Sequence, residues 1–360
     1  MGLLAGILRT EDGTLARTIP LADILSGIEE IFTAYEEQLT RATSLFVAET
    51  TTKAEERVVL NGIDEGQAVD RYGRALETRT EGGYDVAYPW IRQGWAHGWD
   101  HEAFQYLTVG DIQRVLDAQV NGNRKWHLRS IFGAMYNNAN WTHQDNETGT
   151  NRNIKALANQ DGTLYPASAI LEMAESQAEA NHYVVSNYLS SAISSTNNPL
   201  ATIRAKLRMQ YPSGRIVAFI NSAQLIDVRD KLPNFIDAPA SIDASISQTA
   251  SVAQEPGGLM VPGDYIGVDG DTNVHVFTYD STTPSGYITG QVIGRPPLKK
   301  RIPTAPSLQG FLLEAEEEFY PLHRREFRDR SGYGVFDRLS VAIVQLKGSG
   351  AYDVPLVYQK

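Results

Sequence analysis

A stretch that cannot form a core of its own lies between two amphipathic segments of this chain. Residues 49–83 carry glycine at five positions and contain no apolar run longer than Val58-Val59-Leu60. The Asn61-Gly62 step favours a two-residue hairpin turn between short strands. A two-stranded ribbon is barely stable by itself in water. We therefore expect this one to lie on another part of the protein or on a neighbouring copy.

A long helix is predicted on each side of the ribbon. Apolar residues between positions 21 and 45 recur at the spacing of one helical face. A second helix is expected to begin at Thr108 and Asp111 and to continue to Tyr136. Unbroken, it would span ~40 Å at about 1.5 Å per residue and act as a spine. The step Asn121-Gly122-Asn123 is where a kink is expected.

Aromatic residues crowd the segment between the ribbon and the spine helix. They are Tyr84, Tyr88, Trp90, Trp95, Trp99, Phe104 and Tyr106. A platform for stacking nucleic-acid bases would need interleaved basic residues, and only Arg92 is present among them. The segment therefore predicts a packed junction or a contact between subunits.

The second half of the chain alternates between predicted helices and strands. The helices are expected over 168–180, 199–209 and 223–232, and the strands over 215–220, 265–268, 274–279 and 338–346. Residues 238–262 are rich in Ser, Ala, Gln and Gly and predict a surface loop, and residues 352–358 predict an extended tail. This alternation is typical of an α/β subdomain.

Composition excludes several classes of function. The chain has no cysteine, so disulfides, thiolate metal sites and cysteine nucleophiles are impossible. A net charge of −11 disfavours a general grip on nucleic acid, because phosphate binding relies on Lys and Arg. The short apolar run at residues 2–8 has no basic leader and ends at Arg9. It predicts neither a signal peptide nor a membrane span, and the expected origin is cytosolic.

Candidate metal ligands are weak in this sequence. His97 and His101 are four residues apart, but Gly98 between them disfavours a helix and the zinc-hydrolase carboxylate is missing. Packing or surface histidines explain them better. Asp269, Asp271, Asn273 and Asp280 match several ligands of a calcium loop, but Val274 occupies the position that requires glycine.

Other catalytic patterns are also missing. The chain has no phosphate loop, no dinucleotide-binding glycine motif and no nucleophile elbow. The acidic run Glu314–Glu318 is interpreted as the solvated face of a helix beside the basic stretch 323–330, rather than as paired catalytic carboxylates. The sequence therefore predicts no catalytic residue, no cofactor and no metal site.

Four short stretches, together with the order of elements, carry a resemblance to a known family. They are Thr108-Val109-Gly110-Asp111-Ile112, Asn181-His182-Tyr183, Ile216-Val217-Ala218-Phe219-Ile220-Asn221-Ser222, and Gly334-Val335-Phe336-Asp337-Arg338 leading into Val341-Ala342-Ile343-Val344. The arm, ribbon, spine helix, α/β subdomain and late returning strand resemble the major capsid protein of tailed bacteriophages, which has the HK97-type fold. The resemblance covers nearly the whole chain.

This resemblance implies an α+β fold with four parts. Residues 1–48 would be the N-arm and 49–100 the extended β-hairpin E-loop. Residues 101–164 and 305–360 would form the P-domain with its spine helix, and 165–304 the α/β A-domain around the local symmetry axis. The implied function is structural, and the implied location is the virion capsid, assembled in the host cytoplasm.

The resemblance also implies partners. Copies would form hexamers and pentamers of an icosahedral shell around packaged double-stranded DNA, which the acidic chain would contact only weakly and without sequence specificity. A portal protein would join the shell, decoration proteins are possible partners, and the short segment before the first helix favours separate scaffolding. No membrane partner is implied.

One feature of the family is not expected here. Some members join subunits by an isopeptide bond between an E-loop lysine and a C-terminal asparagine. Lys53 is available, but residues 354–360 contain no asparagine, so no crosslink is expected. Two alternatives stay open, namely an encapsulin-type compartment shell and, more remotely, a metal-dependent hydrolase that uses His97, His101 and Asp100.

Overall fold

The computed structural model describes residues 3–59, 83–100, 105–163, 165, 181–238, 261–319 and 322–359. Its helices are α1 (Leu3–Ile7), α2 (Leu21–Thr43), α4 (Val109–Tyr136), α5 (Pro199–Gln210) and α6 (Leu225–Lys231), with 3-10 turns η1 (Ala16–Thr18), η2 (Ser190–Ala192), η3 (Ser222–Gln224), η4 (Pro306–Leu308) and η5 (Leu356–Tyr358). Its strands are β1 (Val47–Thr51), β2 (Glu55–Val59), β3 (Gly83–Ala87), β4 (Ile91–Asp100), β5 (Trp141–Gln144), β6 (Asn151–Ile154), β7 (Tyr183–Val185), β8 (Ile216–Ile220), β9 (Phe235–Asp237), β10 (Asp264–Asp269), β11 (Val274–Thr278), β12 (Tyr287–Val292), β13 (Leu298–Arg301), β14 (Leu312–Phe319), β15 (Leu322–Val335) and β16 (Val341–Gln345).

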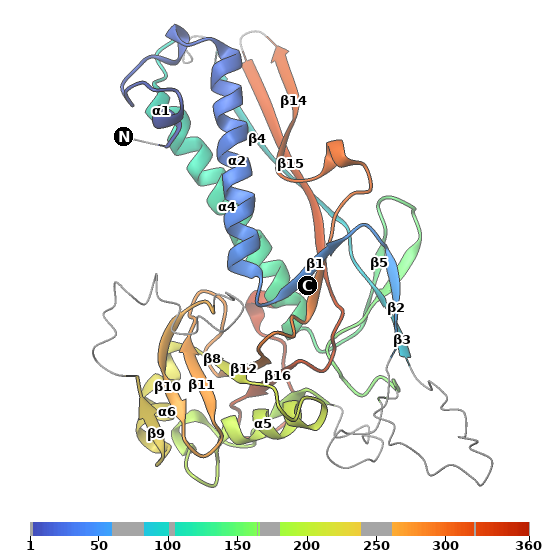
Figure 1. Ribbon diagram of the computed structural model, residues 1–360. Helices are drawn as coiled ribbons and strands as arrows, with labels where there is room; N and C mark the ends of the chain where they lie inside the picture. Colours follow the sequence, from blue (N-terminus) through green and yellow to red (C-terminus); the bar gives the residue numbers. More distant parts are fainter. Residues whose placement is uncertain are drawn as a thin grey trace, which may run out of the picture.

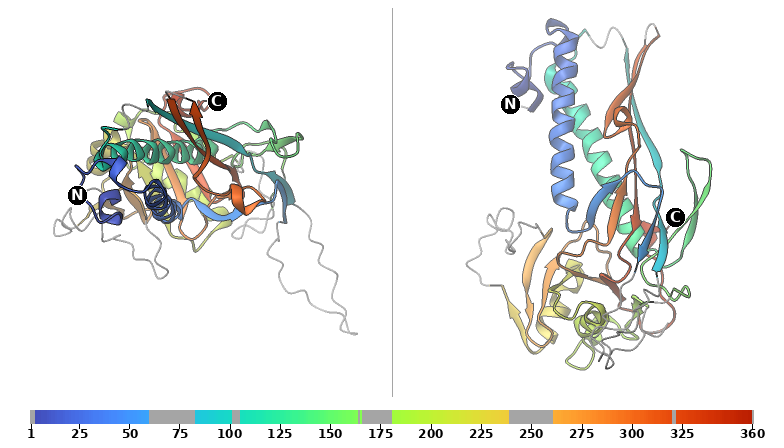
Figure 2. Two further views of the ribbon diagram at one scale, coloured as in Figure 1. Left: turned by 90° about the horizontal axis from the view of Figure 1, so that it is seen from above. Right: turned by 45° about the vertical axis from the view of Figure 1, so that its right-hand side comes forward.

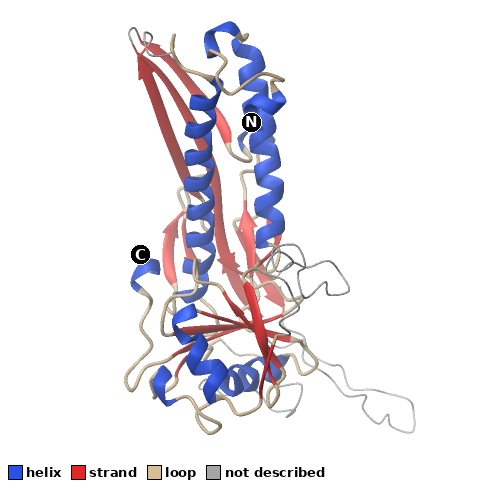
Figure 3. Ribbon diagram, turned by 90° about the vertical axis from the view of Figure 1, so that its left-hand side faces the viewer, coloured by secondary structure: helices blue, strands red, loops and turns tan. Residues whose placement is uncertain are grey.

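The molecule is elongated, with two differently built halves (Figure 1). In one half, α2 and α4 run side by side along the long strands β4, β14 and β15, as Figure 3 also shows. In the other half, a seven-stranded sheet carries α5 and α6. The C-terminal end of α4 reaches into this second half and joins the two.

The spine helix α4 is continuous. Thr108 and Asp111 form a complete capping box, in which each side chain accepts from the other residue's backbone N–H. The helix is assigned without a break through Asn121-Gly122-Asn123. The buried Asn123 side chain bonds to Tyr35 and Asp329 on other elements, so it does not compete for the helical backbone.

The seven-stranded sheet has the order β7-β16-β12-β8-β11-β10-β9. Strand β8 is parallel to β11 and antiparallel to β12, and all of its residues are buried, as predicted for 215–220. Helix α5 packs closely on one face of this sheet. A Cβ atom added at Gly290 on β12 would lie 2.1 Å from Cγ2 of Ile203 on α5, so only glycine permits this approach.

The other face of the sheet receives the end of the spine helix. Phe132 and Tyr136 on α4 pack with Phe219 on β8 and with Phe46, which precedes β1. The Tyr136 hydroxyl lies 2.7 Å from the Thr289 hydroxyl on β12. The helix and the sheet therefore share one core.

The acidic run Glu314–Glu318 is not a helix, which corrects the sequence-based interpretation. It belongs to β14, which pairs antiparallel with β15. The register places Glu316 opposite Arg325 and Glu317 opposite Arg324. An acidic run followed by a basic stretch does not by itself distinguish one face of a helix from two paired strands.

Most other predicted elements are confirmed, with shifted ends. The predicted helices 199–209 and 223–232 correspond to α5 and to η3 followed by α6, and the hairpin predicted around 269–273 joins β10 and β11. The strand predicted over 338–346 is confirmed as the shorter β16. Arg338 is not part of it, because its buried side chain bonds to the segment 156–163. The predicted helix 168–180, the Asn61-Gly62 turn and most of the loop 238–262 lie outside the described residues.

The predicted domain map can be compared with the strand pairings. Strand β4, inside the predicted ribbon 49–100, pairs over ten positions with β15, so only β2 and β3 form a separate ribbon. Strand β13, inside the predicted A-domain, pairs with β1 and β15, and β16, inside the predicted P-domain, lies in the seven-stranded sheet. The residues predicted as an N-arm pack on their own chain through Ile24, Ile28 and Phe32.

Candidate assembly surface

The histidines weighed as zinc ligands are not arranged on a helical turn. His97 and Asp100 are part of the extended strand β4, where His97 is paired with Arg325 on β15, and His101 lies outside the described residues. A strand rises about 3.3 Å per residue, so a spacing of four residues does not bring two side chains together as one turn of a helix does.

The acidic residues weighed as calcium ligands are hydrogen-bonded to separate partners. Asp269 is buried and accepts from the Asn198 side chain at 3.0 Å and from the Thr272 hydroxyl at 2.6 Å. Asp271 accepts from the Asn234 side chain at 2.8 Å. Across the described ranges, no group of three or more His, Asp or Glu side chains could hold a metal ion.

The base of the β2–β3 ribbon is fixed to the body of the molecule by Lys299. Its ammonium lies 2.9 Å from Glu56 on β2 and 2.6 Å from Glu49 on β1, and it sits over the Phe336 ring. Burial opposes the charged form of Lys299, but the hydrogen bonds to Glu49 and Glu56 outweigh burial and raise its pKa. The Tyr84 hydroxyl on β3 donates to the Phe336 carbonyl at 2.9 Å and attaches the second strand.

A buried arginine holds the β5–β6 hairpin beside the ribbon. Arg301 on β13 donates to Asp145 at 3.1 Å, to Glu147 at 2.9 Å and to the Tyr88 carbonyl at 3.2 Å. Burial would raise the pKa of Asp145, but hydrogen bonds from Glu147 and Arg301 outweigh it and lower the pKa. The pair is therefore an ion pair at neutral pH.

A second buried arginine organises the segment after β6. Arg338 donates to the carbonyls of Ala156 and Leu157 and to the side chains of Asn159 and Asp161. Its guanidinium also lies 5.4 Å from the centre of the Tyr84 ring, within cation–π range. One side chain thus connects β3, the segment 156–163 and the start of β16.

A buried polar network fixes α2, α4 and β15 to one another. The Tyr35 hydroxyl donates to Asn123 at 2.7 Å, and Asn123 donates to Asp329 at 3.3 Å. His127 Nε2 lies 2.7 Å from Asp329, and His127 Nδ1 lies 2.8 Å from the Tyr333 hydroxyl. Burial lowers the pKa of His127, so the neutral ring donates from Nε2 and accepts at Nδ1.

Together these contacts make a rigid body with an attached ribbon. Arg301, Arg338, Lys299 and the His127–Asp329 pair are all used to join elements. The sequence did not predict these roles, because charge alone indicates solvent exposure. For Arg338 a partial signal exists, since it ends one of the stretches that carried the family resemblance.

Several large apolar side chains are exposed on the described surface, where contacts between copies could form. They are Leu3, Tyr106, Leu189, Ile226, Ile236, Leu356 and Val357. Among the described residues, none of the helices combines the length and the apolar character needed to cross a membrane.

Solved structures share this fold, although no family model matches the chain and no curated protein matches it. A structure from Mycobacterium phage Patience superposes with a TM-score of 0.67, at 19% identity, over 97% of this chain and 94% of that chain. Two further structures match with lower scores.

The first of these is the capsid of an empty GTA particle, with a TM-score of 0.49 at 10% identity, over 85% of this chain and 90% of that chain. The other is the capsid of Ralstonia phage GP4, with a TM-score of 0.47 at 12% identity, over 86% and 89%. The assignment rests on the phage Patience structure, whose match extends over both halves of the molecule. This chain therefore shares the mixed helix-and-strand fold of the phage Patience structure, and the predicted HK97-type fold is consistent with that match.

Proposed function

We propose that this chain is a major capsid protein, which assembles through hexamers and pentamers into an icosahedral head around packaged double-stranded DNA. The observation that carries the proposal is the fold, matched over nearly the full length of both chains to a structure from a bacteriophage. A likeness in fold alone supports a function without establishing it. The local structure is what a shell subunit needs.

The ribbon supports a role in joining copies. Strands β2 and β3 pair only with each other among the described strands, yet their base is attached to β13 through Lys299. An isolated two-stranded ribbon is marginally stable. Tyr84 and Val86 on one face of the ribbon are buried against their own chain. In the proposed shell, a neighbouring copy covers the other face, so the arm acts as a clasp between subunits.

The proposed domains follow the strand pairings. The E-loop is the ribbon between Glu55 and Ala87, and the P-domain combines α2, α4 and the five-stranded sheet. The A-domain is the seven-stranded sheet with α5 and α6. The partners proposed are other copies, a portal and possible scaffolding or decoration proteins, with packaged DNA held only weakly because the chain carries a net charge of −11.

Electron microscopy of the purified, concentrated protein tests this function. Closed shells of uniform diameter are expected. A small oligomer of fixed size at every concentration would contradict the proposal. DNA inside native particles distinguishes a viral head from an encapsulin-type compartment, which would contain a protein cargo instead.

A further inference from the structure

The turn η5 presents two apolar side chains to solvent from a firmly anchored position. Leu356 is 84% exposed and Val357 is 58% exposed. Between them and the body, Tyr358 is buried, stacks on the Tyr136 ring at 5.1 Å and donates its hydroxyl to the Thr282 carbonyl. Exposing apolar side chains to water is unfavourable. Such side chains on an ordered turn are therefore typical of a contact site for a partner.

A basic side chain flanks these apolar residues. Arg129 on α4 is exposed, and its Nε donates to the Val357 carbonyl at 3.0 Å, which leaves its two terminal NH₂ groups toward solvent. The only acidic residue of the tail, Asp353, is paired with Lys347. Leu356, Val357 and Arg129 therefore form an apolar and cationic protrusion, called here the C-terminal knob.

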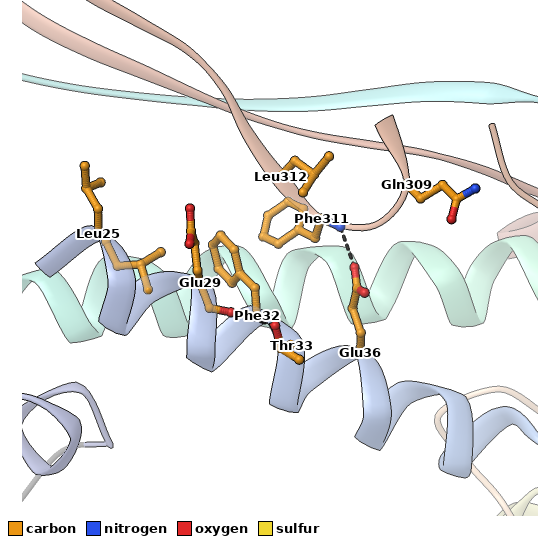
Figure 4. A pocket seen from close by; sticks show the side chains of 9 residues that line it. Leu25, Glu29, Phe32, Thr33, Glu36, Gln309, Phe311 and Leu312 are labelled. Carbon is orange, nitrogen blue, oxygen red and sulfur yellow. Dashed lines mark hydrogen bonds between the residues drawn. The ribbon is translucent and has the colours of Figure 1, made fainter. Parts of the chain in front are cut away.

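An apolar groove that carries acidic rather than basic side chains lies along α2. It is lined by Leu25, Glu29, Phe32, Thr33, Phe311 and Leu312, and its volume is about 370 Å³ (Figure 4). Glu36 closes one end by accepting from the Phe311 backbone N–H. Glu29 is exposed and shares no ion pair with a described residue. We call this apolar and anionic recess the α2 groove.

The knob and the groove lie on opposite sides of the spine helix. Viewed from above, α2 and the C-terminus are separated by α4 (Figure 2). A single copy can therefore use both surfaces at once, each with a different neighbour. Such a head-to-tail contact is heterologous and closes into a ring when the rotation between copies allows it.

We propose that the C-terminal knob of one copy inserts into the α2 groove of a second copy. Leu356 and Val357 fill the apolar part, and the Arg129 guanidinium lies beside the Glu29 carboxylate of the neighbour. The groove volume suits two aliphatic side chains, and the charges are complementary. This inference rests on the proposed shell function, and it names a pair of surfaces that join its copies.

Engineered cysteines test the contact directly, because the natural chain has none and every disulfide reports a designed pair. Chains carrying Thr33→Cys are mixed with chains of different mass carrying Leu356→Cys, and oxidised. The mixed dimer is expected to form at least about tenfold faster than in a control mixture of Thr33→Cys with Ile226→Cys. Only cysteines that the contact holds close together reach the geometry of a disulfide bond. Ile226 is 65% exposed on α6, away from both surfaces.

The outcomes separate the contact from the function. Shells without the selective disulfide refute the contact and leave the shell function standing. A selective disulfide in a protein that never closes shells supports the contact and refutes the function. Mixed dimers that form no faster than the control overturn the proposal in either case.

Charge reversal gives a second test. Arg129→Glu and Glu29→Arg are each expected to reduce assembly, and their combination should restore it, because the exchanged charges again attract. The matched control is Arg229→Glu on α6, a side chain that pairs with its neighbour Asp230. If the double variant assembles no better than the single variant that assembles less well, the pairing of these two residues is contradicted.

Discussion

Buried polar side chains hold this protein together where its elements meet. His182 is fully buried, its Nδ1 donates to the Val341 carbonyl at 2.7 Å, and burial lowers its pKa to about 4. Asp329 is also buried, and it accepts from His127 and Asn123 at once. Burial of the Asp329 carboxylate is offset by these hydrogen bonds, and His182 is held through its Nδ1 hydrogen bond to the Val341 carbonyl.

The protonation of His182 makes a prediction about pH. Its pKa in the folded state lies below the unfolded value of about 6.5, so the folded state resists binding the proton. Stability from this group is full above pH 6.5 and is lost as pH falls toward 4, a difference of about 3 kcal/mol. Urea unfolding at a series of pH values measures it. In His182→Asn the slope between these pH values should be smaller, and an unchanged slope would contradict the assignment.

Removal of the Asp329 carboxylate should lower the free energy of unfolding far more than loss of one hydroxyl nearby. Asp329→Ala leaves the buried donors of His127 and Asn123 without their acceptor and should cost about 3 kcal/mol, as for buried hydrogen-bonding groups left unpaired. Tyr333→Phe removes only the hydroxyl on His127 Nδ1 and should cost about 1 kcal/mol. Denaturant titration at pH 7 compares the two. Equal losses would show that the network does not depend on Asp329.

Among the secondary-structure elements, the ribbon and the spine helix differ in how many contacts hold them to the rest of the molecule. Helix α4 is capped at its start, packed along its length and joined to the seven-stranded sheet at its end. The described part of the ribbon is attached by Lys299, by the Tyr84 hydroxyl and by the packing of Tyr84 and Val86 in a small apolar cluster. The ribbon should therefore open locally more readily than the spine.

Lys299→Met tests the attachment of the ribbon. Methionine keeps the aliphatic packing over Phe336 but removes the ion pairs to Glu49 and Glu56. Because Glu49 is largely exposed, the loss should be modest, and amide hydrogen exchange in β2 and β3 should accelerate about fivefold, equivalent to ~1 kcal/mol. Exchange in α4 serves as the internal control. Equal acceleration in both elements would mean that the variant destabilises the whole molecule instead.

The elements differed in how far the sequence could predict them. The capping residues and apolar spacing of α4 are local signals, and so is the turn between β10 and β11. The pairing of β4, β14 and β15 could not be predicted, because β14 and β15 are charged rather than alternating and β4 is far from β15 in sequence. The roles of Arg301 and Arg338 depend on acceptors contributed by distant segments, which no local pattern reveals.

For the whole molecule, the account predicts that folding and assembly can be separated. Residues 60–82 can be replaced by an Asn-Gly turn, since Val59 and Gly83 are paired at the ends of β2 and β3. The shortened subunit keeps every residue of the described cores and should fold, but it should no longer form shells. Circular dichroism and sedimentation velocity measure the two properties. Loss of the folded monomer would place this segment in the core.

The structure determines which residues the deletion should remove. A longer deletion that began at Glu49 would remove part of β1, whose Thr50 pairs with Lys300 on β13, and would take Glu56 away from Lys299. Such a variant would disrupt the edge strand of the five-stranded sheet together with the ribbon. The shorter replacement therefore isolates the contact between copies.

The proposed function requires that this chain builds a closed shell from many copies of itself. The most direct measurement is electron microscopy of the purified wild-type protein as its concentration is raised. The account predicts closed icosahedral particles of uniform diameter, in which subunits are grouped in hexamers and pentamers. A monomer or small oligomer that persists at every concentration would contradict it.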